Sequence, residues 1–171
     1  MTQVVLDTNV LISAILYGGK PRAILEAALS GSIEVFVSEA IIQEFQAVLL
    51  RPRFGLTVQF VHNVVAELTS LAEWVTPEQH HQVVIEDPSD NLILDCAVAA
   101  KAQYLVTGDA HLLCLQRFQV VAIITPQHGP RMAVSTRSGR FSKLRRVSIF
   151  STMPGCRPPR LASRCWSDLT S

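Results

Sequence analysis

Four acidic residues fall at positions from which a folded chain could bring their carboxylates together: Asp7, Glu44, Asp90 and Asp109. Asp7 directly follows a short apolar run, and Asp109 follows another after Thr107 and Gly108. Asp90 stands at the start of a predicted helix, and Glu44 lies within a second helix beside its apolar face. Carboxylates brought this close repel one another unless cations neutralise them. Hard oxygen ligands of this kind suit Mg²⁺ or Mn²⁺.

A metal ion held by carboxylates would support the hydrolysis of phosphodiester bonds. The ion lowers the pKa of a bound water and so supplies a nucleophile, and a second ion stabilises the leaving oxygen. The sequence shows no Cys or Ser nucleophile with a plausible His base, and it lacks the glycine-rich phosphate loop of nucleotide-binding folds. The acidic set therefore favours metal-dependent hydrolysis.

Strands that alternate with helices are predicted to position these acids. Apolar runs predict buried strands at residues 4–6, 33–37, 104–107 and 120–124, with a short strand or an extended link at 83–85. Apolar spacing and capping signals predict helices at residues 10–16, 22–29, 39–50, 57–75, 90–102 and 110–115. This alternation implies a parallel sheet wrapped on both faces. The carboxyl ends of the strands before Asp7 and Asp109 can then lie side by side.

The charge of the chain is divided between two segments. Residues 1–126 contain 6 Lys or Arg and 13 Asp or Glu, a net charge of −7, whereas residues 127–171 contain 9 Lys or Arg and one acid, a net charge of +8. This asymmetry predicts a domain at residues 1–126. The segment at residues 127–171 is rich in Gly, Pro, Ser and Arg, and we expect it to be disordered because it cannot build a core. The alternative is a basic tail that binds RNA.

The cysteines and the apolar runs indicate the compartment. The four cysteines show neither CxxC pairing nor zinc-ligand spacing, so we expect reduced thiols. No apolar run reaches membrane-spanning length, and the N-terminus has no basic region followed by an apolar stretch. We therefore expect a cytoplasmic protein that does not associate with membranes.

Four stretches of the chain, taken together in this order, resemble PIN-domain proteins of the kind that form the toxin of prokaryotic toxin–antitoxin pairs. They are Val-Leu-Asp-Thr-Asn-Val-Leu at 5–11, the segment 38–44, Asp-Pro-Ser-Asp-Asn at 87–91 and Val-Thr-Gly-Asp at 106–109. The resemblance covers residues 3–126. It implies a three-layer α/β/α sandwich with a central, mostly parallel sheet, and a ribonuclease activity that depends on Mg²⁺ or Mn²⁺.

The resemblance also implies roles for individual residues. The catalytic, metal-binding acids would be Asp7, Glu44, Asp90 and Asp109. The supporting residues would be Thr8, Asn9 and Thr107, which would orient the acids or the reacting water, and Ser38, which would lie nearby. The implied partners are an RNA substrate, an antitoxin protein and a second copy of the chain in a homodimer.

Two features depart from the family pattern. His111 stands where many relatives have an acid, two residues after the Gly-Asp, and we expect it to tune the affinity for metal or to do nothing. The basic segment takes the place of the short final helix that relatives often have after residue 126.

Ordinary structural roles compete with the metal-binding roles. Asp7, Asp90 and Asp109 could each cap a helix, and Glu44 could be a solvated helix acid. Asp87 is interpreted as a turn acid, whereas Asp95 could approach the site or face solvent. The residues His80 and His81 are interpreted as a solvated loop, and Arg51 and Arg53 as surface residues that could contact an RNA phosphate.

Two other functions compete with the nuclease. The first is a catalytically silent PIN-like module that only binds a protein or RNA partner, which the altered C-terminal segment favours and the intact acids disfavour. The second is a phosphatase similar to haloacid dehalogenases, which also begins with a strand followed by Asp. That family requires a second acid two residues later, and position 9 is Asn, so this alternative is the weaker one.

Overall fold

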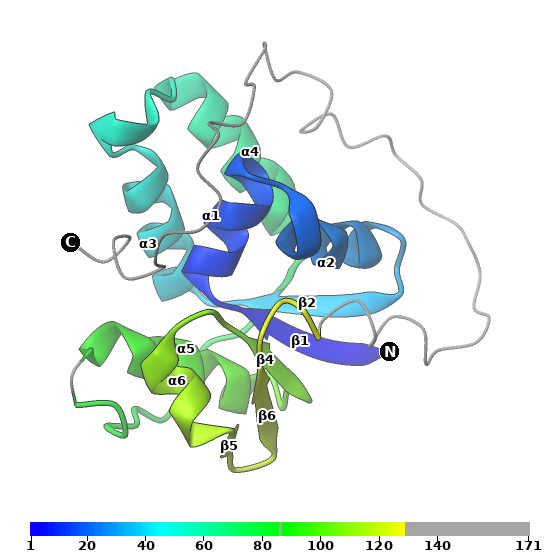
Figure 1. Ribbon diagram of the computed structural model, residues 1–171, viewed down its shortest axis with the longest axis vertical. Helices are drawn as coiled ribbons and strands as arrows, with labels where there is room; N and C mark the ends of the chain where they lie inside the picture. The colour runs from blue at the N-terminus through cyan, green and yellow to red at the C-terminus, as the bar shows by residue number, and fades with distance from the viewer. Residues whose placement is uncertain (86, 129–171) are drawn as a thin grey trace.

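A six-stranded sheet forms the centre of the protein, and helices cover both of its faces (Figure 1). The computed structural model describes residues 1–85 and 87–128. The basic C-terminal segment, predicted at residues 127–171, lies outside the described residues from position 129 onward. In Figure 1, α1 to α4 lie above the sheet and α5 and α6 lie below it, so the predicted three-layer α/β/α sandwich is confirmed.

The strands of the sheet follow the order β3-β2-β1-β4-β6-β5. Their bounds are β1 Thr2–Leu6, β2 Ile33–Val37, β3 Glu73–Trp74, β4 Tyr104–Val106, β5 Arg117–Phe118 and β6 Val121–Ile124. All neighbouring pairs are parallel except β5 and β6, which form an antiparallel pair. The central strand β1 is buried at Val4, Val5 and Leu6, as expected of a parallel strand with helices on both sides.

The helices lie close to the predicted ranges. They are α1 Thr8–Leu16, α2 Gly19–Leu29, α3 Glu39–Leu49, α4 Val58–Leu71, α5 Pro88–Ala99 and α6 Ala110–Leu115, with a 3₁₀ turn at Pro52–Phe54. Carboxylates cap three of them: the side chains of Asp7, Asp87 and Asp109 accept the free backbone N–H groups of α1, α5 and α6. Pro88 stands in the first turn of α5, where it has no N–H to leave unsatisfied.

Two short strands were not predicted from the sequence. The helix predicted at 57–75 ends at Leu71, and Glu73–Trp74 instead pairs with Phe36 and Val37 at the edge of the sheet. The first Gly or Pro after Leu71 is Pro77, six residues later, so the pairing with β2 and not a local stop signal decides where the helix ends. The strand β5 is only two residues long and forms a tight hairpin with β6.

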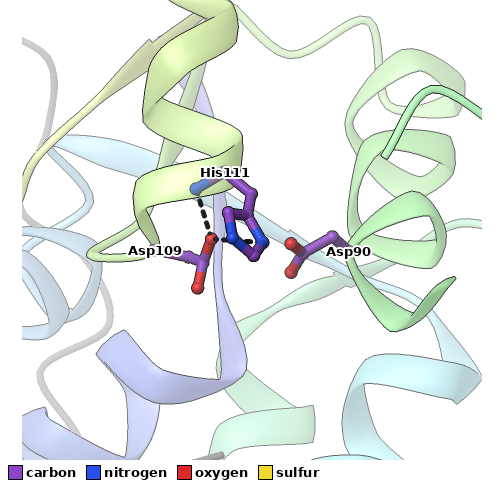
Figure 2. A group of neighbouring side chains, drawn as sticks. All are labelled: Asp90, Asp109 and His111. Atoms are coloured by element: carbon purple, nitrogen blue, oxygen red, sulfur yellow. Dashed lines mark hydrogen bonds and ion pairs between the residues drawn. The ribbon is translucent and has the colours of Figure 1, made fainter. Parts of the chain in front are cut away.

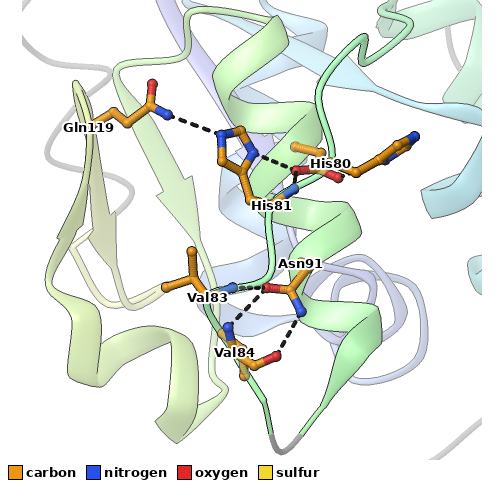
Figure 3. A network of polar contacts seen from close by, with 7 residues as sticks. His80, His81, Val83, Val84, Asn91 and Gln119 are labelled. Carbon is orange, nitrogen blue, oxygen red and sulfur yellow. Dashed lines mark hydrogen bonds and ion pairs between the residues drawn. The ribbon is translucent and has the colours of Figure 1, made fainter.

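The segment before α5 is an extended link rather than a strand, which settles the choice left open at 83–85. One buried side chain, that of Asn91, holds it (Figure 3). The Asn91 Oδ1 atom accepts hydrogen bonds from the N–H groups of Val83 and Val84, both at 2.9 Å, and its Nδ2 atom donates to the Val84 carbonyl at 2.7 Å. Asn91 thereby replaces a sheet partner for this stretch of backbone.

No helix in the described part of the chain is long and apolar enough to span a membrane. Of the four cysteines, the two that lie in this part, Cys96 and Cys114, are both free thiols, as predicted.

Replacement of Asn91 by Ala should lower the free energy of unfolding by roughly 3 kcal/mol, because it leaves three backbone groups without their partner. Denaturant unfolding measures this loss. The matched control is Asn63→Ala on the exposed face of α4, where Asn63 only accepts a hydrogen bond from Gln59. The control should cost less than about 0.5 kcal/mol. An equal loss in both variants would contradict the role of Asn91.

Candidate metal centre

The pairing of β1 with β4 brings Asp7 and Thr107 together across 100 residues of sequence. Leu6 lies opposite Val106 in the sheet, and the Asp7 N–H continues the ladder by donating to the Val106 carbonyl at 3.0 Å. The Thr107 hydroxyl donates to Asp7 Oδ2 at 2.5 Å and itself accepts the N–H of Asp109 at 2.9 Å. One hydroxyl therefore links the acids that follow the two central strands.

The four predicted acids line one small hollow of about 130 Å³. Asp7 reaches it from the end of β1, Glu44 from α3, Asp90 from the first turn of α5 and Asp109 from the end of β4. Its lining residues are Asp7, Asn9, Glu44, Val48, Arg51, Asp87, Ser89, Asp90, Ile93 and Asp109. The structure thus brings together the four acids predicted from the sequence.

Hydroxyl and amide donors fix the orientation of two of these carboxylates. The Thr8 hydroxyl donates to Glu44 Oε2 at 2.9 Å, and the Asn9 N–H donates to Asp7 Oδ1 at 3.1 Å. The Thr107–Asp7 bond is buried, whereas the Thr8–Glu44 bond is partly buried. The predicted supporting roles of Thr8 and Thr107 rest on these contacts, whereas Asn9 contributes its backbone and lines the hollow.

Asp87, and not Asp90, caps α5. The Asp87 carboxylate accepts the N–H of Ser89 at 2.9 Å and also the Ser89 hydroxyl. Asp90 is 7% exposed, and its Oδ2 atom has no hydrogen-bond partner among the described residues. The capping role that competed for Asp90 is therefore taken by its neighbour, and a buried carboxylate oxygen faces the hollow without a partner.

A tighter group within the site includes a residue that is not an acid. Ligand atoms of Asp90, Asp109 and His111 lie within 4.8 Å of one another. Figure 2 shows the His111 imidazole between the two carboxylates. Asp109 Oδ1 accepts the backbone N–H of His111 at 2.7 Å and lies 3.9 Å from its Nδ1 atom.

Burial and mutual repulsion disfavour ionisation of the two buried acids. The pKa of Asp7 is raised from 3.8 to about 6. Burial is the largest cause, the Thr107 and Asn9 hydrogen bonds oppose it, and the charges of Glu44 and Asp109 add to it. The pKa of Asp90 is raised from 3.8 to about 7, chiefly by burial and in addition by the charges of Asp109, Asp7, Asp87 and Glu44. The carboxylates in this hollow therefore repel one another more than the neighbouring side chains compensate.

A divalent cation fits this donor set. It would give the orphaned Asp90 Oδ2 a partner and would offset the repulsion that raises both pKa values. Carboxylate oxygens are the donors that Mg²⁺ and Mn²⁺ prefer. The hollow is thus a candidate metal centre on the chemistry of its own side chains.

Two residues considered from the sequence lie elsewhere. Ser38, predicted to lie near the acids, instead lines a separate hollow together with His80 and Asp95. Its hydroxyl lies beside the thiol of Cys96, whose pKa burial raises to about 12. Asp95 neither approaches the acidic hollow nor faces solvent: it is 3% exposed and anchors the loop before α5.

The interpretation of His80 and His81 as a solvated loop is wrong for His81. Asp95 Oδ1 accepts the His81 N–H at 2.9 Å and lies 2.7 Å from its Nδ1, while Asp95 Oδ2 lies 3.1 Å from Nδ1 of the exposed His80. The side chain of Gln119 meets the other ring nitrogen of His81 (Figure 3). The spacing of 14 residues between His81 and Asp95 gave no signal of this contact.

The two arginines considered as RNA contacts differ in position. Arg51 lines the acidic hollow, and it is the basic member of that lining. The guanidinium of Arg53 lies over the Phe54 ring, 4.8 Å from its centroid. Arg51 is therefore the arginine whose position suits a phosphate at the hollow.

Comparison with known proteins agrees with this geometry. Residues 3–111 match the family model described as PIN domain, which is more than half of the chain, and the protein therefore belongs to the PIN-domain family. PIN domains are generally nucleases that use divalent metal ions. No curated protein matches the chain.

Without divalent cations, the protein should become less stable as the pH rises from about 4 to 7. The folded-state pKa values of Asp7 and Asp90, about 6 and about 7, lie above the unfolded value of 3.8, so the folded state binds protons more tightly across this range. We expect the melting temperature in EDTA to fall as the pH rises through this window. The double variant Asp7→Asn/Asp90→Asn should show a flatter profile, and a wild-type profile that rises with pH would contradict the repulsion.

Proposed function

We propose that this PIN-domain protein is an endoribonuclease that depends on Mg²⁺ or Mn²⁺. The observation that carries the proposal is the convergence of four carboxylates on one hollow, with a buried Asp90 oxygen that has no partner among the described residues. Such a site is costly in the absence of a cation, and a chain that used these acids only as helix caps would not need it.

Two groups of residues would form the site: the acids that bind the cation and the threonines that position the acids. Asp7, Glu44, Asp90 and Asp109 would hold the cation. Thr107 and Thr8 would keep Asp7 and Glu44 in position through the hydrogen bonds already described. When bound, the cation would activate water for attack on phosphorus and would stabilise the charge that develops there.

Substrate must reach a site that repels it, because residues 1–126 carry a net charge of −7. The exposed guanidinium of Arg51 lines the hollow and would donate to a phosphate oxygen of the RNA. Together with the cation, it would offset the repulsion between the RNA backbone and the acids.

Cleavage of a mixed RNA pool by the purified protein should require Mn²⁺ or Mg²⁺ and should stop in EDTA. The variant Asp7→Asn should lower the rate by roughly 100-fold or more, because loss of a supporting contact alone costs 10- to 100-fold in metal sites. Asn preserves the size of the side chain and an oxygen that can accept the Asn9 N–H.

The matched control is Glu73→Gln, which neutralises an exposed acid on the edge strand β3 and should leave the rate unchanged. A folded, metal-loaded wild type that cleaves no RNA would contradict the proposal. It would favour a silent PIN-like module that only binds a partner.

We also propose that the protein acts as the toxin of a toxin–antitoxin pair, as a homodimer held by an antitoxin. The support is the resemblance of its site segments to PIN toxins. Induced expression in bacterial cells should then arrest growth, and Asp7→Asn should relieve the arrest.

For the homodimer, light scattering should give twice the chain mass of 18.8 kDa. Unimpaired growth at high expression of the active nuclease would contradict the toxin role, and a monomeric mass would contradict the dimer.

A further inference from the structure

His111 occupies a position from which its ring can act on the same ion as the acids. It stands in the first turn of α6, directly after the capping residue Asp109 and Ala110. Leu112, the next residue, is fully buried and fixes the helix against the core. His111 instead projects into the space between Asp109 and Asp90, where its ligand atom lies within 4.8 Å of theirs (Figure 2).

An ion pair with Asp109 does not account for this position. The separation between His111 Nδ1 and Asp109 Oδ1 is 3.9 Å, and the His111 side chain is 51% exposed, so such a pair would contribute little to stability. It would also leave the second acid of the group unsatisfied. Asp90 Oδ2 is buried and has no partner within the part of the chain that the structure describes.

The three side chains together offer two oxygens and one nitrogen within 4.8 Å of one another. Mg²⁺ prefers oxygen ligands in a near-octahedral set, whereas imidazole nitrogen suits first-row transition ions better. A histidine in this position would therefore favour a first-row transition ion over Mg²⁺. An all-acid set would carry more charge and no nitrogen.

We propose that His111 is a nitrogen ligand of the cation held by Asp90 and Asp109, and that it biases this centre toward Mn²⁺ over Mg²⁺. The proposal rests on the proposed function only in that the hollow binds a divalent cation. It does not require RNA to be the substrate.

Electron spin echo envelope modulation of the full-length protein loaded with Mn²⁺ tests the ligand directly. The wild type should show the nitrogen modulation of a coordinated imidazole, and His111→Ala should lose it. The matched control is His62→Ala on the exposed face of α4, which should retain the modulation. Mn²⁺ bound to the wild type without nitrogen modulation would overturn the proposal, as would modulation that survives in His111→Ala.

Metal affinities measured by calorimetry test the bias between ions. His111→Ala should weaken Mn²⁺ binding by roughly 10-fold or more and Mg²⁺ binding by much less. His111→Asp should strengthen Mg²⁺ binding and so lower the preference for Mn²⁺. An unchanged ratio of Mn²⁺ to Mg²⁺ affinity in both variants would overturn the proposal. A thermal melt of each variant without metal confirms that it is folded.

The two proposals fail in different ways. Nitrogen modulation in a protein that cleaves no RNA would remove the nuclease and keep the ligand. RNA cleavage that depends on metal, in a protein whose Mn²⁺ shows no nitrogen neighbour, would keep the nuclease and remove the ligand.

Discussion

A buried carboxylate at the end of the central strand is the constraint on which the rest of the site depends. Asp7 is 2% exposed, and the hydrogen bonds that it accepts come from neutral donors, the Asn9 N–H and the Thr107 hydroxyl. Its charged neighbours are acids, which oppose its ionisation. Without a cation, the folded chain ionises this group only with a loss of stability, and a bound cation would offset that loss. Binding of a cation beside Asp7 would therefore link the stability of the fold to the occupancy of the site.

Much of this arrangement could be predicted because local signals coincide with it. The apolar run that ends at Asp7 defines a strand, and the carboxyl ends of parallel strands lie at the same edge of the sheet. Asp87 and Asp90 were separated only in part: Asp87 was interpreted as a turn acid because it precedes Pro88, but the capping role considered for Asp90 belongs to Asp87. The position of Glu44 beside an apolar stripe indicated that it would face inward.

The features that could not be predicted depend on contacts between distant segments. The edge strand Glu73–Trp74 takes its conformation from β2 and not from its own residues. Asp95 is buried, and its partners are His80 and His81, 15 and 14 residues earlier in the chain. Ser38 was expected near the four acids, but it lines a different hollow and its hydroxyl lies beside the thiol of Cys96. In each case the conformation depends on a contact with residues that are too far away in the sequence for periodicity or capping signals to reveal.

The hydrogen bond between Thr107 and Asp7 spans 100 residues, and this separation has a consequence for protein synthesis. The four acids belong to four segments, and the last of them, Asp109, follows a strand that must insert beside β1. A nascent chain that has emerged only as far as α4 contains two of the acids and no neighbour for β1 on that side. The four acids can therefore come together only after Asp109 has been synthesised and β4 has paired with β1, and contacts of such long range form slowly even then.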